Sequence, residues 1–154
     1  MTNRRSLLLL PAALLLARCA PAPKPPAVLT LTMVGSNDQN PDPSGNAAPV
    51  AVKVYQLTAT AKFESSDWTS LTQNEAATLG QDEAAPSQQF VVAPGQTLIQ
   101  SFELKPGVQD IGIIVLYRDI DHAQWRAMAP AASSGPINLT LTIAKAAVTL
   151  QPSK

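Results

Sequence analysis

The chain has 154 residues, of which 14% are charged, and its formal net charge at pH 7 is zero. This length suffices for one domain with a buried core and is short for two. A chain with few charges and no basic excess lacks the electrostatic footprint of a nucleic-acid-binding protein, so we expect no nucleic acid as partner.

The first 18 residues have the pattern of an export signal. Arg4 and Arg5 precede an apolar run at residues 7–17, which is shorter than the roughly 20 residues that span a bilayer. The arginine pair also leaves a twin-arginine route open. Removal of residues 1–18 would leave eight basic and eleven acidic residues, a net charge of −3.

Cys19 is the only cysteine of the chain and directly follows this apolar run. A single cysteine cannot form a disulfide within the chain, and a leader segment could not hold a catalytic nucleophile in place. Its position resembles that of the bacterial lipobox, in which the cysteine is acylated and becomes the first residue of the mature protein. Arg18 departs from this pattern, which has a small residue there. We predict lipidation at Cys19, with simple secretion or an uncleaved anchor as the alternatives.

Residues 19–27 contain four prolines, which favour an extended and stiff conformation. We therefore predict a tether between the lipid and the folded domain. Ala20 stands where an aspartate tends to retain lipoproteins at the inner membrane, so the expected location is the outer membrane.

Period-two alternation of apolar and polar residues predicts strands in the part of the chain that follows. The strand candidates are residues 29–33, 50–57, 90–92, 97–104, 111–117, 137–143 and 148–150. The run IGIIVLY at 111–117 is apolar on both faces, which predicts a central strand.

Proline followed by glycine at residues 93–96 and 105–107 predicts type II turns, which we interpret as hairpin corners. Capping residues before Trp68 and Leu71 predict one helical excursion from Ser65, ended by Gly80. Short strands with one helical excursion over residues 28–151 predict an all-β fold, a two-sheet β-sandwich.

Two long connections interrupt the strand pattern. Residues 35–49 contain no apolar residue larger than alanine except prolines, so we expect this loop to lie in solvent. Residues 118–136 form a second long connection, which we expect to be partly packed. Long ordered loops on a small sandwich are common binding sites.

Residues suited to catalysis or metal binding are scarce. His122 is the only histidine, and although Asp119 and Asp121 lie near it, a solvated loop histidine is the favoured interpretation. The sequence shows no metal-ligand spacing, calcium loop, phosphate loop or nucleophile elbow. We therefore predict no catalytic residue, no metal and no cofactor, and we expect no small-molecule substrate.

Three aromatic and cationic side chains have two interpretations each. Trp125 and Arg126 could anchor an interface, but we favour a packing role in which Trp125 covers the sandwich edge and Arg126 pairs with Asp119 or Asp121. For Trp68 we expect packing in the core under the helical segment.

The order and spacing of many residues resemble the TssJ lipoprotein family of the type VI secretion system. The resemblance spans the chain from the leader to about residue 145 and is carried by Asn40-Pro41-Asp42, Gly45, Pro49-Val50, VKVYQL at 52–57, Phe63, Asp67-Trp68, Leu71, Leu79-Gly80, Pro94-Gly95, Ile111-Gly112, Tyr117-Arg118-Asp119 and Trp125-Arg126. Asn46 is a small departure, because the family often has a basic residue there.

The resemblance implies a transthyretin-like β-sandwich held by its lipid on the periplasmic face of the outer membrane. It also implies binding to the periplasmic C-terminal domain of TssM, the large inner-membrane subunit, through the loop between the first two strands. The expected partner-binding residues are Asn37, Asp38, Asn40, Pro41, Asp42 and Gly45. The alternative is a periplasmic ligand-binding lipoprotein that holds a sugar or peptide near Trp125 and Arg126.

Overall fold

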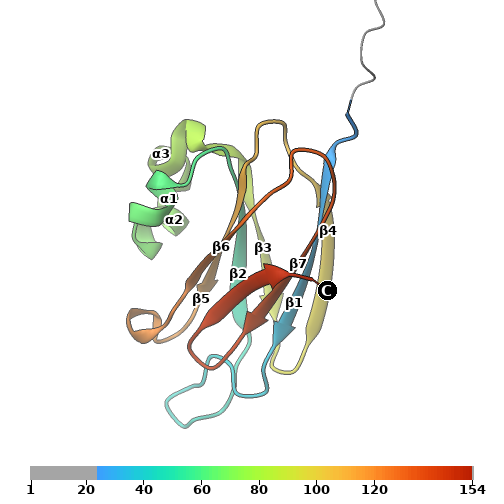
Figure 1. The fold of residues 1–154 in the computed structure, drawn as a ribbon. Coiled ribbons are helices and arrows are strands. Elements are labelled where there is room, and N and C mark those ends of the chain that lie inside the picture. The colour runs from blue at the N-terminus through green and yellow to red at the C-terminus, as the bar shows by residue number, and fades with distance from the viewer. Residues whose placement is uncertain (1–23, 154) are drawn as a thin grey trace, which may run out of the picture.

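The computed structural model describes residues 24–153, which form two four-stranded sheets packed face to face (Figure 1). The predicted two-sheet β-sandwich is confirmed. The predicted signal segment, Cys19 and the first part of the predicted tether, up to residue 23, lie outside the described residues. The elements are β1 (Ala27–Gly35), β2 (Val50–Leu57), α1 (Ala61–Ser65), α2 (Trp68–Gln73), α3 (Glu75–Leu79), the 3-10 turn η1 (Gly80–Asp82), β3 (Glu83–Val92), β4 (Thr97–Glu103), β5 (Asp110–Leu116), the 3-10 turn η2 (Ile120–His122), β6 (Arg126–Pro130), β7 (Gly135–Ile143) and β8 (Val148–Pro152).

The first sheet has the strand order β4-β1-β7-β8, and the second has the order β3-β2-β5-β6. All neighbouring strands are antiparallel except β1 and β7, which run parallel. Strand β5 has a neighbour on each side, so the predicted central position of IGIIVLY is confirmed.

The two proline-glycine turns do not make hairpins, contrary to our prediction. Gly95 and Gly107 have φ of 70° and 88°, the left-handed conformation that a type II turn requires of its third residue. However, the first turn leads from β3 to β4 and the second from β4 to β5, and each pair belongs to different sheets. The predicted position and glycine conformation of both turns were correct, but each turn connects a strand of one sheet to a strand of the other.

Three further differences concern the weakly patterned elements. Strand β6 lies within the connection that we expected at residues 118–136, and β3 begins seven residues before the predicted strand at 90–92. Both are edge strands in which most side chains are half-buried or exposed, so no apolar alternation marks them. The helical excursion begins at Ala61, before the predicted start at Ser65. It consists of three short helices, because Ser66 and Asp67 are extended between α1 and α2 and Asn74 leaves the helical conformation between α2 and α3.

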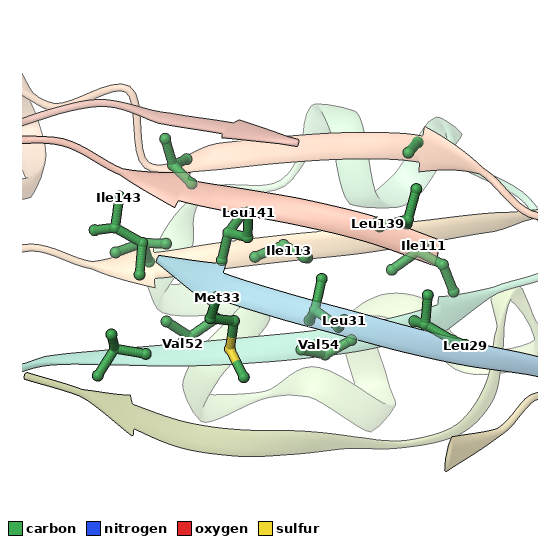
Figure 2. Close-up of a cluster of buried hydrophobic side chains, with 14 of the residues drawn as sticks. Leu29, Leu31, Met33, Val52, Val54, Ile111, Ile113, Leu139, Leu141 and Ile143 are labelled. Atoms are coloured by element: carbon green, nitrogen blue, oxygen red, sulfur yellow. The ribbon is translucent and has the colours of Figure 1, made fainter. Parts of the chain in front are cut away.

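The core between the sheets is formed by every second side chain of the inner strands. Figure 2 shows these side chains pointing toward one another from both sheets. Burying one such side chain contributes about 1.5–3 kcal/mol to folding. The labelled members are Leu29, Leu31, Met33, Val52, Val54, Ile111, Ile113, Leu139, Leu141 and Ile143.

A second apolar cluster lies between the helices and the outer face of the second sheet, which explains why β5 is apolar on both faces. Gly112 makes this contact possible, since a Cβ there would lie 2.8 Å from Cζ of Phe63. Trp68 lies half-buried outside the cluster, so its predicted packing in the core is wrong. The buried members are Tyr55, Leu57, Phe63, Leu71, Leu79 and Ile114.

A polar contact joins α3 to β2 and β3. Lys53 Nζ lies 2.5 Å from Glu75 Oε2, and Glu75 also accepts hydrogen bonds from the backbone N–H and the hydroxyl of Ser87. Burial raises the pKa of Glu75, but the bonds from Lys53 and Ser87 outweigh it and lower the pKa to about 2. Burial and the neighbouring Glu75 raise the pKa of Glu83 to about 8, and Glu83 Oε1 is buried without a partner.

The strand directions give the sandwich two distinct ends (Figure 1). At the tether end, the chain enters β1 from residues 24–26. The opposite end, here called the loop end, carries the β1–β2 loop (residues 36–49), the β3–β4 turn (93–96), the β5–β6 connection (117–125) and the β7–β8 turn (144–147). At about 3.3 Å per residue step, the eight steps along the nine residues of β1 separate the two ends by roughly 26 Å.

Within residues 24–153, no helix is long and apolar enough to cross a membrane.

Candidate partner-binding loops

All six predicted partner-binding residues lie in the β1–β2 loop, at the loop end of the sandwich. Figure 1 shows this loop at the bottom of the molecule, on the opposite side from the point where the chain enters β1. The six residues differ in exposure. Asn37, Asp38 and Gly45 are exposed, Pro41 and Asp42 are half-buried, and Asn40 is buried.

Asn40 is the residue that holds three connections of the loop end together. Its side chain donates to Pro49 O and accepts from Arg118 N, both at 2.8 Å, and its own N–H donates to Lys145 O at 3.1 Å. Its φ of 47° is left-handed, a conformation that asparagine adopts more readily than most residues. Asn40 therefore fixes the loop from inside.

The neighbouring Gln39 is fully buried. Its Nε2 donates to Ala48 O at 3.3 Å and to Val92 O at 2.8 Å, so it ties both ends of the loop to β3. The prediction that residues 35–49 lie in solvent is therefore wrong for Gln39, Asn40 and Ala48, and also for Gly35, which is buried at the end of β1. The loop has no large apolar residue, and buried amides that satisfy backbone carbonyls take the place of apolar packing.

The apex of the loop is organised by Asp42. Its carboxylate accepts hydrogen bonds from Ser44 N at 2.8 Å and Asn46 N at 2.9 Å. The hydrogen bonds from Asn46, together with that from Ser44, lower the pKa of Asp42 below its usual range. Gly45 follows with a φ of 85° and open space around its Cα, so the apex projects as an ordered turn.

The exposed start of the β1–β2 loop lies next to the β3–β4 turn. Ser36 donates to Asp38 Oδ1 at 2.7 Å, and a Cβ on Gly95 would lie 2.6 Å from Asn37 Oδ1. Asn37 therefore packs against the proline-glycine turn, while Asn40, Pro41 and Asp42 face the β5–β6 connection.

Two hollows flank Pro41. One has a volume of about 120 Å³ and the other about 460 Å³, and both are lined by Pro41 and Asp119. Arg118, Asp119 and Lys145 were not among the predicted partner-binding residues, because they come from other loops. The remaining lining residues are Asn40, Tyr117, Lys145 and Ala146 in the smaller hollow, and Asp42, Pro43 and Arg118 in the larger.

Tyr117 anchors the base of this region. Its side chain is buried, and its hydroxyl lies within hydrogen-bonding distance of Ala144 O at 3.1 Å and of Ala147 O at 2.7 Å. Tyr117 directly follows β5 of the second sheet, and the two carbonyls belong to the β7–β8 turn of the first sheet. The hydroxyl therefore joins a loop of one sheet to a loop of the other. The signal for this role was present in the sequence, where Tyr117-Arg118-Asp119 closes the central strand.

His122 and Asp119 form a pair in the β5–β6 connection, with Nδ1 2.7 Å from Oδ1. The side chains are 82% and 74% exposed, so water competes for both groups. The hydrogen bond and charge of Asp119 raise the pKa of His122. Among the residues that the structure describes, no three His, Cys, Asp or Glu side chains gather closely enough to hold a metal ion.

Arg126 points away from these loops, so its predicted pairing with Asp119 or Asp121 is wrong. Its guanidinium donates to Phe63 O at 2.5 Å and Ser66 O at 3.0 Å, at the end of α1. It also lies 4.7 Å from the centre of the half-buried Trp125 ring. These two residues hold the helices to the sheet, and none of the hollows beside Pro41 is lined by them.

Solved structures of the type VI secretion system share this fold. The T6SS lipoprotein TssJ1 from Pseudomonas aeruginosa is 26% identical with a TM-score of 0.80, and the match covers 84% of this chain and 98% of that one. The Lip protein of Serratia marcescens is 23% identical with a TM-score of 0.69, covering 84% and 97%. A chain of a structure described as a type VI membrane complex is 21% identical with a TM-score of 0.71, covering 81% and 98%.

Among curated proteins no match was found. The sequence model of the family described as "Type VI secretion lipoprotein, VasD, EvfM, TssJ" matches residues 27–146, which include β1 through β7 and the whole β1–β2 loop. The chain belongs to this family of type VI secretion lipoproteins.

Proposed function

We propose that this protein is an outer-membrane lipoprotein that anchors the type VI secretion membrane complex by binding the periplasmic C-terminal domain of TssM. In this proposal Cys19 carries the acyl chains on the periplasmic side of the outer membrane, and the loop end binds the partner. The predicted tether at residues 19–27, whose last residue Ala27 is also the first residue of β1, joins the lipid to the sandwich. The protein holds its partner in place and carries out no catalytic step.

The observation that carries the proposal is the position of the ordered β1–β2 loop at the end opposite to the tether. A lipid on Cys19 would place the tether end next to the membrane and would direct the loop end into the periplasm. Asn40, Gln39 and Tyr117 fix the loop before binding, which reduces the entropy lost on association.

A further solved structure has the same fold. A chain in a structure described as "T6SS protein TssM C-terminal domain (869-1107) from EAEC" has the same fold, with 20% identity and a TM-score of 0.65 over 82% of this chain. At this identity the likeness concerns the fold alone, so TssM as partner remains part of the proposal.

The binding test uses substitutions that spare the buried amides of the loop. We expect Asp38→Arg combined with Asp42→Arg to weaken binding to the TssM periplasmic domain at least tenfold, about 1.4 kcal/mol. Isothermal titration calorimetry on the Cys19→Ala full chain, purified from the periplasm, measures this affinity. Glu103→Arg, at the tether end, is the matched control and should bind as the parent does. Equal affinity of all three proteins would rule out the β1–β2 loop as the interface.

The anchoring test removes the thiol in the cell. A single acyl chain binds membranes marginally, whereas several chains anchor stably. We expect Cys19→Ala to yield a folded periplasmic protein that leaves the membrane fraction and no longer supports secretion. Mass spectrometry of the parent should show acyl chains on Cys19. Continued membrane fractionation of Cys19→Ala would contradict lipid anchoring.

A further inference from the structure

The tether end carries a hollow that the partner site does not use. Its volume is about 370 Å³, and it is formed where the chain enters β1, between the β4–β5 and β6–β7 connections. The tether residues Pro25 and Pro26 form one wall, Pro106 and Gly107 form another, and Ser133 closes the third side.

The charges around this hollow are mainly positive. Lys24 and Lys105 line it with exposed side chains, and Glu103 is the acidic residue among the lining residues. The loop end differs in sign, because Asp38, Asp42, Asp119 and Asp121 there outnumber the basic residues Arg118 and Lys145. Lys24 and Lys105 thus lie beside the point where the chain enters β1, whereas the exposed Lys145 lies at the loop end, where aspartates outnumber basic residues.

The large apolar side chains that line the hollow are turned inward. Leu104 and Val108 line the hollow but are only 4% and 6% exposed, and the remaining lining residues are prolines, alanines, glycine and polar residues. Such a surface offers charge and small rigid residues without a large apolar group that could enter the hydrocarbon layer. Its chemistry suits the phosphate layer of a membrane.

The length of the tether limits how far this end can lie from the membrane. Five residue steps separate Cys19 from Lys24, and a fully extended chain spans at most about 3.6 Å per step, or roughly 18 Å. The headgroup layer of one leaflet occupies about 5–8 Å of that distance. The distance between Lys24 and the phosphates is therefore at most about one Debye length, over which charges still attract at physiological salt.

We propose that the tether end is a membrane-contact surface, in which Lys24 and Lys105 bind phosphate groups of anionic phospholipids and hold the sandwich upright with its loop end away from the bilayer. This inference rests on the lipid anchor of the proposed function. The lipid fixes the protein to the membrane, and the two lysines fix its orientation.

The experiment measures orientation rather than attachment. The acylated full chain, whose Cys19 thiol is blocked by lipid, is reconstituted into vesicles of phosphatidylethanolamine and phosphatidylglycerol. A fluorophore is placed on Ser133→Cys at the tether end or, as the matched control, on Ser44→Cys at the apex of the β1–β2 loop; both serines are exposed. A quencher on the lipid headgroup reports which end lies at the membrane.

We expect strong quenching at position 133 and little at position 44. Combining Lys24→Glu with Lys105→Glu should lower the quenching at position 133 about fivefold or more. Each lysine near an anionic surface contributes about 1 kcal/mol of attraction, which is a factor of about five in the equilibrium constant. Lys145→Glu, the same charge change at the loop end, should leave it unchanged. Vesicles of phosphatidylcholine alone should give the low value for every variant.

Two outcomes would overturn the inference. Equal quenching at positions 133 and 44 in the acylated protein would show that the sandwich has no preferred orientation. Quenching at position 133 that survives the double lysine substitution would show that the lysines do not set it. Absence of acyl chains, detected separately by mass spectrometry, would instead contradict the lipid anchor itself.

Discussion

The loop end and the helical segment are both additions to the same sandwich, but they are held by different forces. The helices α1–α3 bury Phe63, Leu71 and Leu79 against the second sheet. The β1–β2 loop has no such side chain and is held by the amides of Gln39 and Asn40.

This difference has a physical reason. Apolar burial is nondirectional and requires large side chains, whereas a buried amide satisfies particular backbone groups and fixes a loop in one conformation. A polar loop can therefore be ordered without an apolar core of its own. The helical segment contributes stability, and the loop end contributes a defined surface.

The largest effect should come from the apolar cluster. We expect Phe63→Ala to lower the free energy of unfolding by about 3–5 kcal/mol, because it leaves a cavity over Gly112 and Ile114. Urea denaturation of the Cys19→Ala chain measures this change. Val91→Ala, at a side chain that is 58% exposed, is the control and should change stability little. A loss below 1 kcal/mol would show that the helices are not held mainly by apolar burial.

Asn40→Ala should lower the free energy of unfolding by an intermediate amount, and its main effect should be faster amide hydrogen exchange in the β1–β2 loop. It removes two side-chain hydrogen bonds and leaves Pro49 O and Arg118 N without that partner, at a cost of about 1–3 kcal/mol. Amide hydrogen exchange should accelerate in the β1–β2 loop and remain slow in β2 and β5.

Asn46→Ala provides the matched control for Asn40→Ala, since Asn46 is exposed and its side chain makes only a surface contact with Asp42. It should leave both the unfolding free energy and the exchange of the loop nearly unchanged. Equal effects of the two substitutions would mean that burial of Asn40 does not order the loop.

The smallest effect should appear in the pH dependence of stability. Glu83 binds its proton up to about pH 8 in the folded protein, whereas an unfolded glutamate loses it near its usual pKa of about 4.5. The unfolded state therefore binds fewer protons between these values, and stability falls as pH rises through this window. Glu83→Gln should remove this fall, on the order of 1 kcal/mol after solvent screening, in denaturation curves at pH 5 and pH 8.

Glu75 contributes in the opposite direction at lower pH. Its pKa of about 2 in the folded protein lies below its unfolded value, so its stabilisation is present above about pH 4.5 and is lost as pH falls toward 2. Glu75→Gln should therefore destabilise the protein at pH 5 and have little effect near pH 2.

For the prediction on Glu83, the same pH dependence of stability in Glu83→Gln as in the parent would contradict the assignment to Glu83.

The strongly patterned strands were predictable from the sequence because each buries one face. Alternation located β1, β2 and β7, and the doubly apolar run located the central β5. Strands β6 and the first half of β3 were not predictable, because edge strands are held by backbone pairing with a neighbour and their side chains need not be apolar.

The position of the β1–β2 loop was predictable from the sequence, but its contacts with other loops were not. The β1–β2 loop could be recognised in the sequence by its length and polarity. The burial of Asn40, however, depends on carbonyl and N–H groups from residues 49, 118 and 145. No local pattern shows that these groups meet. For the same reason, Lys145 and Arg118 could not be assigned to the loop end before the topology was known.

The two-sheet sandwich, the central strand and the family could be inferred from the sequence alone, because periodicity and residue order are local properties of the chain. The crossing of turns between sheets, the burial of particular polar residues, and the grouping of four loops at one end of the sandwich became clear only from the folded structure. These features arise from contacts between segments far apart in the sequence, and such contacts depend on how the two sheets are paired and packed.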